Sequence, residues 1–156
     1  MIGPDPKRGR TMDRRGFCAA ACALPLTVAT AKAGRRSYAV ADGTYAQAAE
    51  VRAPQRLLFV SGQVPADAEG EVPADFRAQC RLAWRNVGAR LEAADMAYEH
   101  LVKVTVYLAR REDRDAAREV RQEVLGRLAH PPALTVVVAE IYDSAWLLEI
   151  EAIAAA

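Results

Sequence analysis

Apolar residues recur with the period of a helix in two segments of the chain. From Phe76 to Ala94 they fall every three or four positions, which is one stripe of an amphipathic helix whose first turn would hold Pro73. The second stripe consists of Ala117, Val120, Val124 and Leu128. Asp113 is a suitable N-cap residue for this second helix, and Pro131-Pro132 forbids its continuation.

Other segments have the apolar patterns of strands. Leu57 to Val60 is a continuous apolar run, expected to be buried on both faces and to end at Ser61-Gly62. The segment 100–108 alternates between apolar and polar residues, and its covered face would hold Val102, Val104, Val106 and Leu108. Residues 134–141 and 147–154 predict two further strands, and a weak first strand is expected either near Tyr38 or over Ala46–Val51.

The order strand, helix, strand, helix, strand, strand predicts an α+β domain with two helices on one face of a mixed sheet. The chain of 156 residues is long enough for one such domain and its core. The other sheet face would have no helix over it. A partly apolar face of this kind favours association with further copies of the chain.

Residues 1–33 have the three parts of a secretory signal peptide. Arg14-Arg15 precedes an apolar run from Phe17 to about Ala29, and Ala31-Lys32-Ala33 places small residues at both positions of a cleavage site. The twin arginine resembles the signal of the Tat pathway, which predicts export to the periplasm and no membrane attachment after cleavage. The alternatives are an untargeted basic leader, lipid attachment at Cys18 or Cys22, and a start at Met12.

The charge balance differs between this leader and the rest of the chain. The whole sequence has 21 Lys and Arg, 20 Asp and Glu, and a net charge of +1. Residues 34–156 contain 15 basic and 18 acidic residues, so the predicted domain is mildly acidic. An acidic domain has little electrostatic attraction for nucleic acid, and we expect no such partner.

Several short motifs occur in a recognisable order from residue 38 to residue 154. They are Tyr45-Ala46-Gln47, Leu58-Phe59-Val60-Ser61-Gly62-Gln63-Val64-Pro65, Gly70-Glu71-Val72-Pro73, Asn86-Val87 with Leu91-Glu92-Ala93-Ala94, the strand Val102 to Leu108, Pro132-Ala133, and Leu148-Glu149-Ile150-Glu151-Ala152-Ile153-Ala154. In this order and spacing they resemble the Rid family, also called the YjgF type, of reactive-intermediate deaminases.

The resemblance implies a single RidA-like domain over residues 34–156 with the fold of trimeric chorismate mutase. It also implies a homotrimer with ligand pockets between neighbouring subunits. The best-known activity of the family is the hydrolysis of 2-imino acids or their enamine tautomers to 2-keto acids and ammonia. That reaction needs neither a metal nor an organic cofactor, and we expect neither here.

The resemblance also assigns roles to individual residues. Glu149 matches the glutamate that orients the attacking water, and burial would raise the pKa of such a carboxyl toward that of a general base. The substrate-binding positions would be Tyr45, Ser61, Gly62, Leu134, Val136 through its main chain, and Arg118 on the second helix. Each of these has an ordinary structural alternative, from packing to a strand-ending turn or a solvated side chain.

One position departs from the family pattern. Active deaminases have an arginine after Pro-Ala that binds the substrate carboxylate, whereas Leu134 follows Pro132-Ala133 here. Leucine offers neither a charge nor a donor, and losing a buried charged pair costs about 2–5 kcal/mol of binding. The sequence therefore predicts a hydrolase for an imine or enamine of an altered substrate class, with Arg118 as a possible substitute cation.

Two other functions remain open. The first is a protein that binds a small neutral ligand without converting it, because an apolar lining favours neutral guests. The second is nucleic-acid cleavage, which some family members have been assigned and which the acidic domain argues against. His100 and His130 have no ligand spacing between them, so we expect no metal site. Cys80 lies on the apolar stripe of the first helix and is expected to be a buried hydrophobe.

Overall fold

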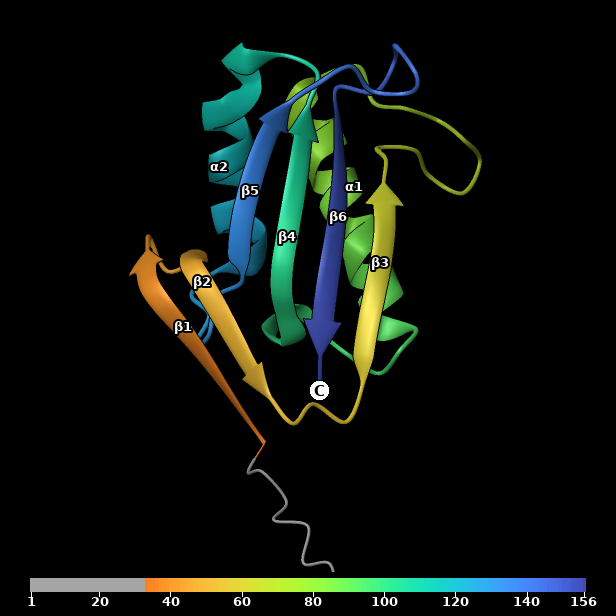
Figure 1. Ribbon diagram of the computed structural model, residues 1–156. Helices are drawn as coiled ribbons and strands as arrows, with labels where there is room; N and C mark the ends of the chain where they lie inside the picture. Colours follow the sequence, from red (N-terminus) through yellow and green to blue (C-terminus); the bar gives the residue numbers. More distant parts are fainter. Residues whose placement is uncertain (1–32) are drawn as a thin grey trace, which may run out of the picture. The chain divides into compact units, whose positions relative to one another are not determined.

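The computed structural model describes residues 33–156 as one α+β unit. Two helices lie behind a six-stranded sheet in Figure 1, and the face toward the viewer has no helix over it. The predicted signal peptide, apart from Ala33, lies outside the described residues. No helix among residues 33–156 is long and apolar enough to cross a bilayer.

The strand order is β1-β2-β5-β4-β6-β3. The strands are β1 (Gly34–Ala41), β2 (Tyr45–Arg52), β3 (Leu57–Gln63), β4 (Leu101–Leu108), β5 (Ala133–Val138) and β6 (Leu148–Ala155). The helices are α1 (Phe76–Glu92) and α2 (Arg114–Leu125), with short 3-10 turns at Tyr98–His100 and Arg111–Asp113. β4 is parallel to β5 and antiparallel to β6, so the sheet is mixed as expected.

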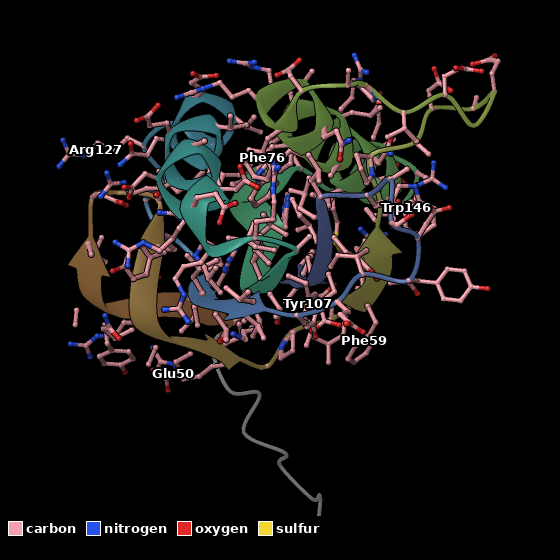
Figure 2. The ribbon with its side chains drawn as sticks, turned by 90° about the horizontal axis from the view of Figure 1, so that it is seen from above. Glu50, Phe59, Phe76, Tyr107, Arg127 and Trp146 are labelled. Atoms are coloured by element: carbon pink, nitrogen blue, oxygen red, sulfur yellow. The ribbon has the colours of Figure 1, made fainter. Side chains whose placement is uncertain are left out.

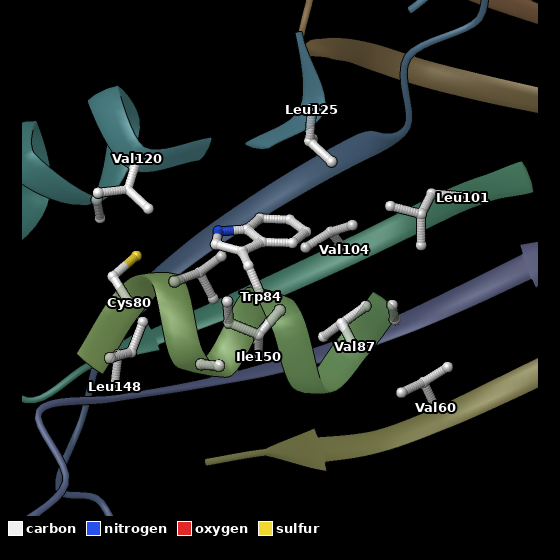
Figure 3. Packing of buried hydrophobic residues seen from close by; sticks show 14 of the residues in the cluster. Val60, Cys80, Trp84, Val87, Leu101, Val104, Val120, Leu125, Leu148 and Ile150 are labelled. Carbon is white, nitrogen blue, oxygen red and sulfur yellow. The ribbon is translucent and has the colours of Figure 1, made fainter. Parts of the chain in front are cut away.

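The core lies between the two helices and the central strands. Trp84 is 1% exposed, and its ring meets Tyr98 edge-on at 6.1 Å between centroids. Figure 3 shows Trp84 of α1 among Val104 of β4 and Val120 and Leu125 of α2. Burial of this one apolar face provides the main stabilisation of the domain, because the hydrophobic effect scales with the apolar area removed from water.

The first sheet edge is a hairpin where the sequence predicted one weak strand. β1 and β2 pair antiparallel around Asp42 and Gly43, which both have positive φ, +47° and +78°. Asp-Gly is a typical pair for such a turn, because it tolerates the left-handed conformation. β2 pairs with β5 only at Ala46 and Ala133, so the pairing of the hairpin with the rest of the sheet is confined to the start of β2, next to the turn.

The prediction that Leu57–Val60 is buried on both faces was wrong. β3 is an edge strand that continues through Ser61-Gly62 to Gln63, and Phe59 is 71% exposed. Figure 2 shows Phe59 and Tyr107 on the side of the sheet opposite the helices, whereas Phe76 lies on the helix side. The apolar run therefore divides between the core and the uncovered face.

One buried position and two helix ends also differ from the predictions. In β4 the fully buried Leu101 replaces Val102 in the core, because pairing with β6 is irregular between Leu101 and Lys103. The first helix begins after Pro73, at Phe76, since Asp75 accepts a hydrogen bond from the Ala78 amide and so caps it. The second helix ends at Gly126 and does not reach Leu128.

Asp113 precedes α2 at the predicted position, but its side chain makes no capping bond. Its carboxylate instead accepts hydrogen bonds from the Arg110 guanidinium, with Nε to Oδ2 at 2.8 Å. The start of α2 is thus tied to the end of the preceding strand by an ion pair. This contact orients the helix that carries Arg118.

Candidate functional site

A cavity of about 370 Å³ lies between α2 and the helix-covered side of the sheet. Its lining comes from both helices and three strands: Tyr45, Cys80, Trp84, Val106, Arg114, Ala117, Arg118, Arg121, Leu134 and Val136. A volume of this size suits a small metabolite. Of the six predicted substrate-binding positions, Tyr45, Arg118, Leu134 and Val136 meet in this cavity.

The strand register explains why Leu134 and Val136 face the cavity. Leu134 pairs with Val104 and Val136 pairs with Val106, and both partners point into the core under the helices. Side chains on paired positions of adjacent strands share one face of a sheet. Val136 is nevertheless 41% exposed, so the helices do not close over the far part of β5.

The buried arginine of the cavity is Arg121, only 6% exposed. Its Nε donates to Thr44 Oγ1 at 3.2 Å, its Nη2 to Asp42 Oδ2 at 3.3 Å, and its guanidinium lies 5.3 Å from the centre of the Tyr45 ring. Burial lowers the pKa of Arg121, and the charge of Asp42 opposes that shift. Because arginine remains protonated in proteins, Arg121 brings a permanent positive charge into the wall.

Asp42 is held by the hairpin turn that it begins. Its Oδ1 accepts from the Thr44 amide at 3.1 Å and from the Thr44 hydroxyl at 2.6 Å, and Gln122 Nε2 donates to Oδ2 at 3.1 Å. Burial favours the neutral acid, but these bonds and the charge of Arg121 outweigh it, so the pKa of Asp42 is lowered. The network fixes the β1–β2 turn, and with it Tyr45, against α2.

The other predicted site residues lie elsewhere in the chain. Glu149 is half-buried on β6 and pairs with Tyr107, so its side chain leaves from the uncovered face of the sheet. It extends over Gly62 on β3, where a Cβ atom would lie 1.5 Å from Glu149 Oε1. Glycine is therefore required for this carboxylate position. Ser61 lines a separate hollow on the uncovered face, together with Lys103 and Glu151.

One chain thus brings the predicted site residues together in two groups. Tyr45, Arg118, Leu134 and Val136 line the cavity on the helix side, and Ser61, Gly62 and Glu149 lie along β3 and β6. Leu134 and Glu149 leave the sheet from opposite faces. A single subunit therefore does not assemble the whole predicted constellation.

Sequence reasoning missed several lining residues, above all Arg121 and Arg114. Positions 114, 118 and 121 follow the spacing i, i+4, i+7, which places them on one helix face beside Ala117. That spacing was visible in the sequence and could have identified an arginine-lined surface. Asp42-Gly43 was also a visible hairpin signal and could have placed Tyr45 near α2.

Cys80 lines the cavity but is suited to packing. Its side chain is 1% exposed, and burial raises its pKa to about 12. The thiolate, which is the nucleophilic form, is scarce at neutral pH under these conditions. Within residues 33–156 there is no cluster of three or more His, Cys, Asp or Glu side chains suited to holding a metal ion.

This fold and cavity define a small α+β protein with a ligand-sized hollow beside a mixed sheet. The model of the family described as Endoribonuclease L-PSP matches residues 36–156. The chain therefore belongs to this family, which includes the YjgF, RutC and Rid proteins.

Known relatives agree with this assignment. A RutC family protein of Pyrococcus horikoshii is 38% identical over 114 residues, which is 72% of this chain and 86% of the relative. "Putative reactive intermediate deaminase TdcF" of Escherichia coli strain K12 is 33% identical over 117 residues, covering 73% and 88% of the two chains. The crystal structure of the E. coli YjgF gene product superposes with a TM-score of 0.60 at 31% identity, over 76% of this chain and 92% of that one.

The Asp42–Arg121 network makes a testable contribution to stability. Asp42→Asn leaves the buried guanidinium without its anion, and we expect the free energy of unfolding at pH 7 to fall by about 1–3 kcal/mol. Because the folded-state pKa of Asp42 is lowered, its contribution is present above the unfolded-state pKa and is lost as pH falls through the folded-state pKa. The difference from the parent should therefore shrink below about pH 4.

Urea unfolding at pH 7 and pH 3 measures this difference. Glu123→Gln is the matched control, because the Arg81–Glu123 pair joins the two helices at 2.9 Å with both side chains half exposed. Such a surface pair contributes at most about 1 kcal/mol. If both variants lose the same free energy of unfolding at pH 7, the Asp42 network contributes no more to stability than an exposed ion pair.

Proposed function

We propose that this protein hydrolyses a small imine or enamine, with Glu149 as the general base. The observation that carries the proposal is the place of the Glu149 carboxylate directly over Gly62, in space that the side chain of any larger residue at position 62 would fill. Family membership supports this class of reaction. The relative TdcF, whose name describes it as a "putative reactive intermediate deaminase", supports it as well.

The chemistry requires water, one base and a means of protonating nitrogen. Glu149 would take a proton from water as the oxygen attacks the C=N carbon and would pass that proton to nitrogen, giving a carbinolamine. It would then move the hydroxyl proton to the amino group as the C–N bond breaks, so that a carbonyl compound and ammonia leave. An enamine would first accept a proton at carbon. A carboxylate within hydrogen-bond reach of the water can perform both transfers.

We further propose that the working site is shared between subunits of a homotrimer. Leu134 and Glu149 leave opposite faces of one sheet, so the cavity and the carboxylate can contribute to one site only if different copies supply them. The uncovered face also exposes Leu57, Phe59 and Val137 by 55%, 71% and 37%. Exposed apolar groups on such a face favour burial against another copy.

Leu134 distinguishes this site from that of the 2-imino acid deaminases. The start of β5 supplies an apolar wall where those enzymes have a carboxylate-binding arginine. We therefore propose an altered substrate class, in which any charged group of the substrate is held from another direction. Ammonia release distinguishes a hydrolase from a protein that only binds its ligand. Ligands would stabilise a non-catalytic binding protein against unfolding, but no ammonia would be released.

RNA cleavage, which the family description contains, has weaker support. The described domain is mildly acidic, and an excess of acidic residues repels the phosphate backbone. The cavity also has a volume of about 370 Å³, which suits a metabolite better than a polynucleotide.

Substitution of Glu149 tests the proposed base. We expect Glu149→Gln to lower kcat for ammonia release by at least about a hundredfold, because the amide cannot accept the proton of the attacking water. Imines and enamines generated in solution serve as substrates. Glu151→Gln is the matched control, since Glu151 lies two residues along the same strand and accepts a hydrogen bond from Tyr107 at 3.2 Å. Equal activity of parent and Glu149→Gln would exclude the proposed base.

Mixing two inactive variants tests whether the site is shared between subunits. Glu149→Gln removes the base, and Leu134→Trp fills the cavity, so each variant alone should be inactive. In trimers refolded from an equal mixture, random assembly makes about a quarter of the sites intact on both sides, and about a quarter of parental activity should return. A mixture as inactive as its components, in particles that sedimentation shows to be trimers, contradicts a shared site.

The N-terminal segment allows a test of localisation. We propose that residues 1–33 direct export by the Tat pathway, on the evidence of Arg14-Arg15 and the segment that follows. Replacement of both arginines by lysine keeps the charge and should retain the precursor in the cytoplasm. Cell fractionation with blotting measures this, with Arg8→Lys and Arg10→Lys as the matched control. Unchanged periplasmic yield of the Arg14 and Arg15 variant rules out a Tat signal.

A further inference from the structure

We propose that the cavity binds the carboxylate of a small organic acid through the arginine face of α2, with the apolar body of the acid against Leu134. The inference rests on the proposed function, since it names the substrate class of the same site. It assigns substrate recognition to Arg121 and Arg114 as well as Arg118. The positive charge that binds the substrate would then come from α2, whereas the active deaminases have it at the start of the strand equivalent to β5.

The arginine face is a property of the helix itself. Arg114, Arg118 and Arg121 follow one another at intervals of four and three residues, so their side chains share one side of α2. All three line the cavity. Of the ten residues that line it in the described part of the chain, three are arginines and none is acidic. The cavity therefore has a positive wall without a compensating carboxylate inside it.

Such an arrangement is unfavourable for the helix alone. Like charges four residues apart repel one another and destabilise an isolated helix. The anions near these arginines lie outside the cavity lining. Asp115 approaches Arg118 at 3.6 Å and Arg114 at 3.8 Å from an exposed position, and Asp42 binds Arg121 from the hairpin turn. The side of each guanidinium that faces the cavity has no acid beside it among the lining residues.

Arg121 is already fixed in the position of an anion receptor. The contacts to Asp42 and Thr44 use two of its five N–H groups, and the Tyr45 ring lies beside the guanidinium. A buried arginine held by other groups loses little side-chain entropy when a ligand binds. Arg118 and Arg114 have side chains 52% and 73% exposed, so they can close on an anion at the entrance.

The rest of the lining determines what kind of anion fits. Trp84 of α1 and Leu134 and Val136 of β5 add apolar surface to the lining. A fully hydrophilic anion such as phosphate would leave this surface wet, whereas a carboxylic acid with an aliphatic body would cover it. Leucine at position 134 thus enlarges the apolar part of the site, and α2 supplies the charge that β5 lacks.

Isothermal titration of the trimeric or full-chain protein with 4-methyl-2-oxopentanoate tests the proposal, with its uncharged amide as the matched ligand. We expect the acid to bind at least tenfold more tightly than the amide at low salt and to lose that advantage at high salt, because guanidinium–carboxylate attraction is screened. The double variant Arg114→Gln, Arg118→Gln should bind the acid at least tenfold more weakly than the parent does, with no change in its affinity for the amide. Arg118→Lys should retain part of the difference.

Arg85→Gln is the control, since Arg85 lies on α1 and lines a different groove. Equal affinity for acid and amide, tighter binding of inorganic phosphate than of the acid, or an equal loss in the Arg85 control would each overturn the proposal. The ammonia-release measurement with Glu149→Gln is independent of this titration. Acid-selective binding without any turnover would contradict the proposed reaction alone, and turnover without acid selectivity would contradict only the arginine receptor.

Discussion

Burial of one sheet face under two helices is the constraint on which the rest of this structure depends. Neighbouring strands lie about 4.8 Å apart and packed helices about 8–10 Å apart, so two helices cover roughly four strands. The sheet has six. Trp84 fills the space where α1, α2 and the central strands meet, and cover becomes incomplete toward β5 and the β1–β2 hairpin.

The cavity lies where that cover is incomplete. α2 passes beside β5 without closing over Val136, and β2 pairs with β5 only at Ala46. An empty space of this size would destabilise an ordinary core, because lining atoms lose packing partners. Here the ion pair of Arg121 with Asp42 and the Tyr45 ring hold the walls in place. The same interactions that fix the hairpin to α2 therefore shape the space for a ligand.

The sheet face without helices carries both polar side chains and an exposed aromatic ring. Its polar groups include Lys103, whose pKa is lowered by burial, and Tyr107, whose pKa is raised by burial and by the nearby charge of Glu151. Phe59 on the edge strand is largely exposed. Under the proposed trimer, that face would bring Glu149 of one copy to the cavity of another. The departure at Leu134 would then change which acids are accepted and leave the water-activating side intact.

Much of this protein follows from the sequence by itself. Periods of two and of about 3.6 residues identified α1, α2, β4 and β6, because each pattern reports which side of an element is buried. A run of β-branched residues identified β5. The ordered motifs from Tyr45 to Ala154 indicated the family, and the leucine after Pro132-Ala133 is the basis for proposing an altered substrate class. The Asp42-Gly43 pair and the arginine spacing on α2 were also present in the sequence, although their meaning depended on what lay opposite.

Only the tertiary structure decided which residues share a space. Leu57–Val60 looked buried on both faces because an apolar run does not record whether its strand is central or at an edge. The burial of Arg121 depends on Asp42 and Thr44, nearly eighty residues away. The separation of Leu134 from Glu149 onto opposite faces depends on strand register. Contacts between distant segments set all three, and local periodicity carries no information about them.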